Sequence, residues 1–197
     1  RHCLDSVVVL SFPHKAQLEM VILYLFLALL LILVNGFFVL AEFAAVKMRP
    51  SRIRELMENG VRGAAAAKHV QDKLDEYLSV CQVGITFTSI GLGFVAEPAL
   101  ADLIEPVLDW LKIFPEKSSQ AILTAHAVAA AMSLLIASYL HTLIGELIPK
   151  SMAIRRTDRS SLLTAAPLRV VRTIFLLPLW ILTGSANVLL RLMGLGG

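Results

Sequence analysis

The sequence is poor in charged residues. Asp, Glu, Lys and Arg make up 17% of its 197 residues, whereas soluble globular domains carry about 25%. Apolar residues reach 57%, and they fall in long unbroken blocks rather than in alternating or one-sided patterns. This composition excludes a disordered chain and an ordinary soluble enzyme, and it is typical of a membrane protein.

Cysteine and catalytic motifs are also scarce. The two cysteines, Cys3 and Cys81, are far apart and no CxxC pair is present, which excludes a disulfide scaffold and a thiolate metal centre. The sequence contains no HExxH motif, no glycine-rich phosphate loop and no signature of nucleophilic catalysis. We therefore expect a protein that is not an enzyme and needs no organic cofactor.

Three apolar blocks are long enough to cross a membrane, which takes about 20 residues. They cover residues 21–40, 78–96 and 121–148. The second block is rich in glycine and hydroxylated residues, as is typical of a helix that packs among other helices in lipid. The third is so long that it must tilt or break. The prediction is an all-α membrane protein with three transmembrane helices.

A fourth hydrophobic stretch, residues 174–190, is interrupted by Pro178, Gly184 and Asn187. An amphipathic segment with Arg169 and Arg172 precedes it. We favour juxtamembrane helices that lie along the inner interface of the membrane. A fourth crossing is the alternative.

Basic residues mark one side of the membrane. They crowd the segment 47–77 and the chain after the third block, whereas residues 99–120, which we expect to form a loop, hold only Lys112 and Lys117 beside four acidic residues. By the positive-inside rule, the loop 47–77 and the C-terminus are cytoplasmic and the N-terminus is outside. The loop 47–77 is itself expected to be helical, because Ser51 and an alanine run favour helices, and to pack against the basic tail.

The two ends of the chain indicate where the natural protein begins and continues. Residues 1–17 form an N-terminal extension that we expect not to be native, with the natural start near Met20. A cleaved signal peptide is the alternative, but the first block exceeds the roughly 7–15 residues of such a hydrophobic region. The glycines at the C-terminal end indicate a linker.

Glu146 is the strongest candidate for a functional residue. An ionisable group inside a membrane span is costly unless it faces protein or water. Pro149 lacks an N–H, so it leaves the carbonyl of Gly145, four residues back, without its helical partner. A free carbonyl and a carboxylate thus lie side by side, and a hard cation with oxygen ligands would satisfy both.

Neutral oxygens are expected at a similar depth. Asn35 in the first span and Thr86 or Thr88 in the second fall within about one or two helical turns of Glu146 in depth, at ~1.5 Å per residue. An all-oxygen set suits Mg²⁺ and suits zinc poorly. Hydrogen bonds between helices are the alternative role for the amide and the hydroxyls. Gly36 is a place for close packing beside Asn35.

An ordered set of motifs resembles the transmembrane domain of the CorC/CNNM family, some of whose bacterial members are called hemolysin-like. The resemblance covers residues 18–195. It is carried by NGFFVLAEFAAVK at 35–47, YLS at 77–79, QVGIT at 82–86, GLG at 91–93, EP at 97–98 and GELIPK at 145–150.

The resemblance implies a dimeric Mg²⁺ exporter of the bacterial inner membrane, coupled to Na⁺ in some members, with cytoplasmic CBS domains that this chain does not contain. It implies that Gly145 and Glu146 hold the ion. The family's first-span serine positions fall on Asn35 and Val39, and its second-span asparagine falls near Thr86 or Thr88. The function expected is Mg²⁺ efflux. The alternative is a membrane-embedded ion-sensing regulator or scaffold that transports nothing.

Overall fold

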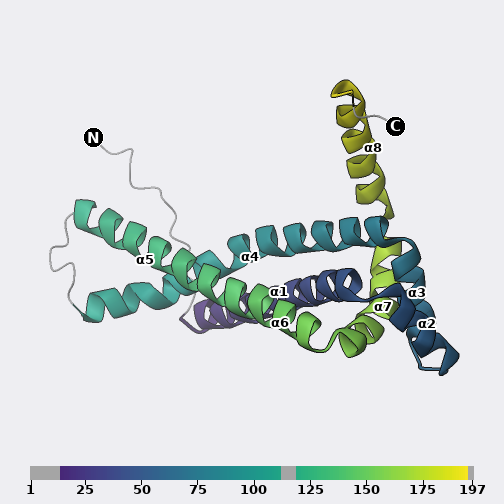
Figure 1. Ribbon diagram of the computed structural model, residues 1–197. Helices are drawn as coiled ribbons and strands as arrows, with labels where there is room; N and C mark the ends of the chain where they lie inside the picture. Colours follow the sequence, from purple (N-terminus) through teal and green to yellow (C-terminus); the bar gives the residue numbers. More distant parts are fainter. Residues whose placement is uncertain (1–13, 112–118, 195–197) are drawn as a thin grey trace. The chain divides into compact units, whose positions relative to one another are not determined.

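The computed structural model describes residues 14–111 and 119–194, and all of its regular elements are helices (Figure 1). Within these ranges there is no strand, so the all-α prediction is confirmed. The predicted extension 1–17 lies mostly outside the described residues. The elements are α1 (His14–Lys47), α2 (Pro50–Glu58), α3 (Ala64–Asp72), α4 (Leu74–Trp110), α5 (Ser119–Leu140), the π-helix η1 (His141–Leu147), α6 (Ile148–Arg155), α7 (Thr157–Ile174) and α8 (Leu176–Leu192).

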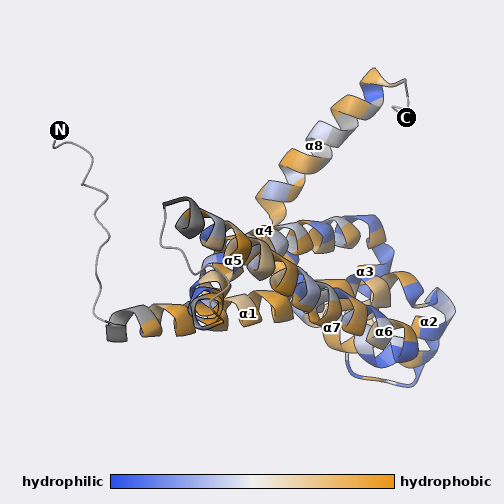
Figure 2. Ribbon diagram, turned by 90° about the vertical axis from the view of Figure 1, so that its left-hand side faces the viewer, coloured by the Kyte–Doolittle hydropathy of each residue, from blue (hydrophilic) through white to orange (hydrophobic). Residues whose placement is uncertain are grey.

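Three helical stretches are long and apolar enough to cross a membrane: Leu18–Lys47, Leu74–Leu108 and Leu123–Arg155. They contain 30, 35 and 33 residues, more than the ~20 that a hydrocarbon core requires. The three predicted spans are therefore confirmed, and each helix continues beyond its apolar block. Figure 2 shows the contrast between the largely hydrophobic α1 and the more hydrophilic α2.

The segment 99–120, expected to be a loop, is largely helical. The helix α4 continues through Pro98 and Pro106 to Trp110. Each proline removes a single backbone donor, while Ala99 and Leu108 are buried and give this part of α4 a packed face. Tertiary packing thus outweighs the helix-breaking tendency of the prolines. Residues 112–118 lie outside the described part of the chain.

The chain divides into two compact units. The first contains the start of α1, up to Leu29, and residues 94–137; in it His126 contacts the carboxylate of Glu105. The second contains residues 30–93 and 138–197. Its core brings together α1, α3, α4, α7 and α8 around buried Phe38, Tyr77, Val80, Cys81 and Leu168.

The basic segment of the second unit folds as predicted, into helices that pack on the tail. Between α2 and α3, Gly63 adopts a φ of +89°, a conformation that favours glycine, and a Cβ there would lie 3.0 Å from the carbonyl of Leu162 on α7. Arg52 of α2 pairs with Glu55 and, at 2.9 Å, with Asp158 of α7. The hydrogen bond to Glu55 and, to a smaller extent, the one to Asp158 raise the pKa of the Arg52 guanidinium.

The fourth hydrophobic stretch begins with a sharp bend. The axes of α7 and of the start of α8, up to Leu182, differ by 74° across the break at Phe175. If this bent pair is counted as one span, the number of candidate crossings rises from three to four. The exposed side of α7 carries Leu163, Val170 and Ile174, as expected for an amphipathic helix at an interface.

Candidate ion site

The third span is interrupted by a π-helical segment just before Pro149. In η1 the hydrogen bonds run over five residues instead of four, so the N–H of Ile148 reaches the carbonyl of Leu143. Such wide turns are rare and frequently occur at functional sites. The predicted break in the third block is therefore a π-helix, and it contains both Gly145 and Glu146.

The carbonyl of Gly145 finds its partner on another helix. It accepts a hydrogen bond of 3.0 Å from Nδ2 of Asn35 on α1. The absence of an N–H on Pro149 explains why this carbonyl is available, as the sequence predicts. At membrane depth an unpaired carbonyl costs several kcal/mol, so the bond fixes α1 against the third span.

Asn35 also connects to the second span. Its side chain is completely buried, and its Oδ1 lies 2.8 Å from the hydroxyl of Thr88 on α4, which donates to it. The same hydroxyl lies 2.9 Å from the carbonyl of Gly84 and 3.0 Å from the carbonyl of Ile85, about one turn back on its own helix. Because a hydroxyl has one hydrogen, Thr88 donates to one of these oxygens at a time. We call Asn35, Thr88 and Gly145 the three-helix cluster.

Small residues allow this approach. A Cβ on Gly36 would lie 3.1 Å from the ring of Pro149 and 3.5 Å from the carbonyl of Ile144. A Cβ on Gly145 would lie 3.2 Å from Nδ2 of Asn35. Contacts this close leave little room for any larger residue, so both glycines let the polar groups meet.

The structure separates the two candidate threonines. Thr86 is exposed, and its hydroxyl donates to the carbonyl of Gln82 on the same helix at 2.8 Å. Thr88 is buried within the three-helix cluster. Two residues turn a helix by about 200°, so Thr86 and Thr88 face nearly opposite directions. Val39, which matches a family serine position in the resemblance, is buried and apolar.

Glu146 follows the cluster directly along the chain. Its side chain is half-buried, and it makes no hydrogen bond or ion pair with the residues that the structure describes. By contrast, every fully buried side-chain polar atom in the described ranges has a partner. An unpaired carboxylate in a membrane-spanning segment is a default functional candidate.

The chemistry of the cluster is that of neutral oxygen. A carbonyl has two lone pairs, so Gly145 O and Asn35 Oδ1 each keep one acceptor site beyond the bonds described above. The described residues contain no group of three His, Cys, Asp or Glu that could hold a metal. The neutral oxygens of the cluster therefore suit a hard cation and suit zinc poorly.

One neighbour of the cluster has no role in the predicted site. His141 occupies the first position of η1, and its Nε2 lies 3.4 Å from the hydroxyl of Ser89 on α4. A Cβ on Gly145 would come within 3.0 Å of the His141 ring. The spacing of four residues between His141 and Gly145 is the sequence signal that places them on one helix face.

The comparison with known proteins agrees with this architecture. Residues 26–197 match the family model described as the Cyclin M transmembrane N-terminal domain. The chain belongs to the CorC/CNNM family. This confirms the resemblance seen in the motifs, and the chain is a multi-pass membrane domain of CNNM type.

Several relatives of this CNNM domain come from Bacillus subtilis. The chain is 42% identical over 165 residues to the UPF0053 protein YhdT and 39% identical over 166 residues to the UPF0053 protein YrkA. It is also 39% identical over 174 residues to the UPF0053 protein YhdP. These alignments cover 84%, 84% and 88% of the chain, but only 34%, 37% and 38% of the relatives.

Proposed function

We propose that this domain binds Mg²⁺ and moves it out of the cell. The observation that carries the proposal is the π-helical break in the third span. There the released carbonyl of Gly145, held by Asn35, lies next in the chain to Glu146, a carboxylate with no partner among the described residues.

Each residue would have a distinct task. Glu146 supplies the negative charge, which makes the entry of a cation into the span less costly. Gly145 and Asn35 offer neutral carbonyl oxygens, and Thr88 offers a hydroxyl oxygen. Mg²⁺ requires six oxygen ligands and loses water reluctantly, so water completes its coordination. Thr86 would contribute only if α4 rotated.

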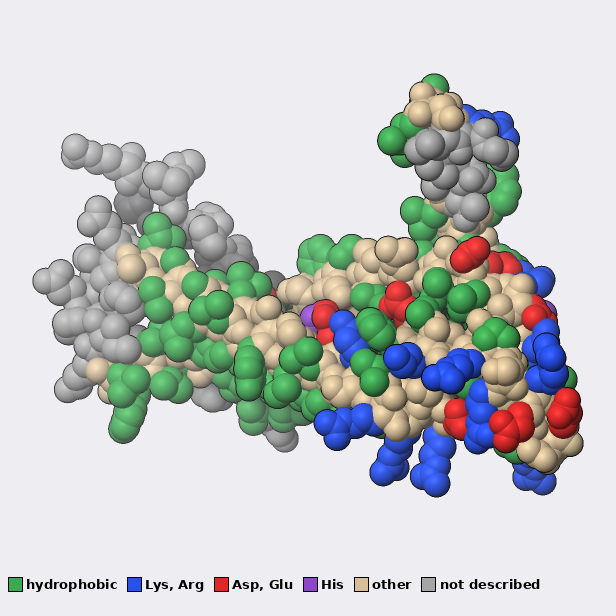
Figure 3. Space-filling view, viewed as in Figure 1, with side chains coloured by type: hydrophobic (Ala, Val, Ile, Leu, Met, Phe, Trp, Pro, Cys, Tyr) green, Lys and Arg blue, Asp and Glu red, His purple; other side chains and the backbone are tan. Residues whose placement is uncertain are grey.

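The setting of the site is also part of the proposal. We place the domain in a bacterial plasma membrane, with the N-terminus outside and the basic end cytoplasmic. Figure 3 shows Lys and Arg side chains gathered over α2, α6 and α7, and exposed members of this set are Arg49, Arg54, Arg155, Arg156 and Arg159.

Three further elements follow from the family resemblance: Na⁺ as the coupling ion, a homodimer, and cytoplasmic CBS domains in the full-length protein. The chain spans 34% and 37% of the length of the relatives YhdT and YrkA, so these three elements concern a longer protein than the part compared.

A regulator or scaffold that does not transport is the second candidate. It is favoured by the three-helix cluster itself, because the side chains of Asn35 and Thr88 already satisfy each other and the Gly145 carbonyl. A satisfied polar network holds helices together without any ion. The two candidates differ in whether Glu146 is needed for flux.

The test is Mg²⁺ flux from vesicles that contain the full-length protein, followed with an Mg²⁺-sensitive dye. We expect Glu146→Gln to reduce the flux by at least about tenfold, because ligand charge sets cation affinity. Glu97→Gln is the matched control, since Glu97 is a half-buried carboxylate on another span and lies outside the cluster. Equal flux from wild type and Glu146→Gln would refute the site. No flux from folded wild type would favour the regulator.

A further inference from the structure

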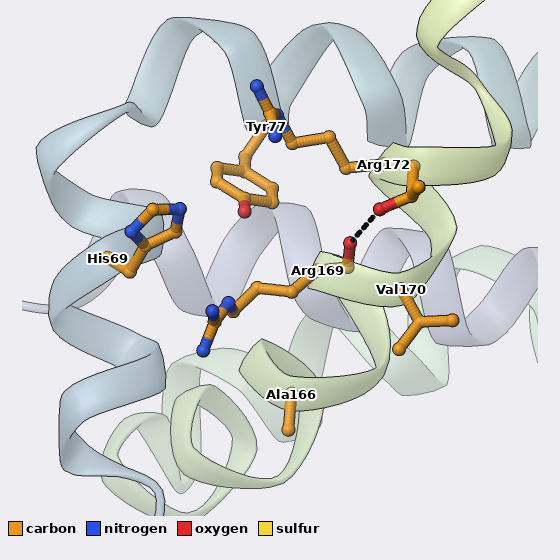
Figure 4. A pocket seen from close by; sticks show the side chains of 7 residues that line it. His69, Tyr77, Ala166, Arg169, Val170 and Arg172 are labelled. Carbon is orange, nitrogen blue, oxygen red and sulfur yellow. Dashed lines mark hydrogen bonds between the residues drawn. The ribbon is translucent and has the colours of Figure 1, made fainter.

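A cavity of about 470 Å³ opens at the basic end of the second unit (Figure 4). It lies between α3, the first turn of α4 and α7. Its lining includes His69, Tyr77, Ala166, Arg169, Val170 and Arg172. Tyr77 is only 1% exposed and packs edge-on against the ring of His69, so one wall of the cavity belongs to the core.

The cavity has an excess of positive charge. The guanidinium of Arg172 is neutralised by Glu76, at 2.5 Å from its carboxylate. Arg169 forms no ion pair with the residues that the structure describes, and Figure 4 shows its side chain extending toward the His69 side of the cavity. A guanidinium with donors to spare next to an imidazole and a phenol is a typical environment for a phosphate group.

An apolar stripe on α7 meets the cavity at Val170. Leu163, Val170 and Ile174 are 70%, 64% and 71% exposed, and their spacing of seven and four residues places them on one face of α7. Val170 belongs both to this stripe and to the cavity lining. An occupant with an anionic head and an apolar tail would therefore match both surfaces.

The depth of the cavity fits such an occupant. Tyr77 lies three residues after the start of the candidate span Leu74–Leu108, which is about 5 Å along a helix. The cavity thus lies at the end of a span, where the headgroups of a bilayer begin. Basic pockets at this level recognise anionic lipid headgroups.

We propose that this cavity binds the phosphate group of an anionic phospholipid, with Arg169 as its main charged contact and the stripe Leu163, Val170 and Ile174 against the acyl chains. The lipid would stabilise the contact of α7 with α3 and α4. This site is separate from the three-helix cluster, so either proposal can fail without the other.

The experiment is native mass spectrometry of the purified chain in mild detergent, titrated with phosphatidylglycerol, with phosphatidylcholine, or with phosphatidylglycerol plus millimolar inorganic phosphate. We expect the wild type to retain phosphatidylglycerol in preference to phosphatidylcholine. Arg169→Gln should weaken that binding about fivefold, the effect of one basic residue near an anionic lipid surface. Arg159→Gln is the matched control, because Arg159 is exposed on the same helix but does not line the cavity.

A second variant tests the cavity without removing charge. Ala166→Leu should fill part of the space and weaken phosphatidylglycerol binding while every guanidinium remains. It carries the test if Arg169→Gln fails to fold, as judged by circular dichroism. The proposal is overturned if Arg159→Gln and Arg169→Gln lose equal affinity, if Ala166→Leu binds like wild type, if the two lipids bind equally, or if inorganic phosphate displaces the lipid.

Discussion

Thr86 and Thr88 lie two residues apart on α4 and make a matched pair for testing the three-helix cluster. Thr88→Val keeps the shape of the side chain and removes the hydroxyl that donates to Asn35 Oδ1. Thr86→Val removes a hydroxyl that is exposed and bonded only within its own helix. The two variants therefore differ in whether an interhelical bond is lost.

The expected sizes follow from burial. A buried hydrogen bond contributes about 1 kcal/mol net, and interhelical bonds in membrane proteins average about 0.6 kcal/mol. Thr88→Val should lower the free energy of unfolding by about 1 kcal/mol, and Thr86→Val by less than about 0.5 kcal/mol. Asn35→Ala should cost about 2–4 kcal/mol, because it removes two bonds and leaves the Gly145 carbonyl without a donor.

The assay is unfolding by sodium dodecyl sulfate in mixed micelles, followed by circular dichroism. A double-mutant cycle of Asn35→Ala and Thr88→Val should give a coupling of about 0.5–1.5 kcal/mol. A coupling near zero would mean that Thr88 donates to a carbonyl of its own helix, that of Gly84 or Ile85, rather than to Asn35. The cluster would then not join the first and second spans. Equal losses for Thr86→Val and Thr88→Val would also refute the reasoning.

Two further predictions concern the packing of the spans. Gly84→Ala should destabilise the domain by about 1–3 kcal/mol, because a Cβ there would come within 2.5 Å of the Phe38 ring. Gly93→Ala should be neutral or stabilising in the same unfolding assay, because a Cβ there would meet nothing within 4 Å. A larger loss of stability for Gly93→Ala than for Gly84→Ala would contradict this packing. Pro149→Ala restores an N–H that can return the Gly145 carbonyl to the helix, so we expect thermal stability to be kept or raised while Mg²⁺ flux falls. Unchanged flux in that variant would show that the release of this carbonyl has no functional role.

Most of the architecture can be predicted from the sequence, because the length of an apolar run and the missing N–H of a proline are local properties of the chain. The three spans followed from uninterrupted apolar runs, and the release of the Gly145 carbonyl followed from Pro149 alone. The number of residues from the inner end of each span predicts that Asn35, Gly145 and the two threonines lie at a similar depth in the membrane. In the structure, Asn35 and Thr88 are in contact.

What the sequence left open depended on rotation and tertiary packing. Thr86 and Thr88 lie at nearly the same depth in the membrane, so depth alone does not distinguish them. Only the rotation of α4 about its own axis decides which of the two faces α1. The helical continuation of α4 through Pro98 was missed because the burial of Ala99 compensates for the lost donor. The role of Gly84 was equally hidden, since its neighbour Phe38 is 46 positions away in the chain.

The π-helical segment also preserves the phase between the two halves of the third span. A regular α-helix turns by about 100° per residue, but a wide turn takes up one extra residue without passing that rotation on to the chain beyond it. A single deletion within His141–Leu147 would therefore close the wide turn into a regular helix and leave the buried Ala153 of α6 on its packed side. The wide turn is thus the place where the third span can change its length by one residue without turning the basic helices away from their partners.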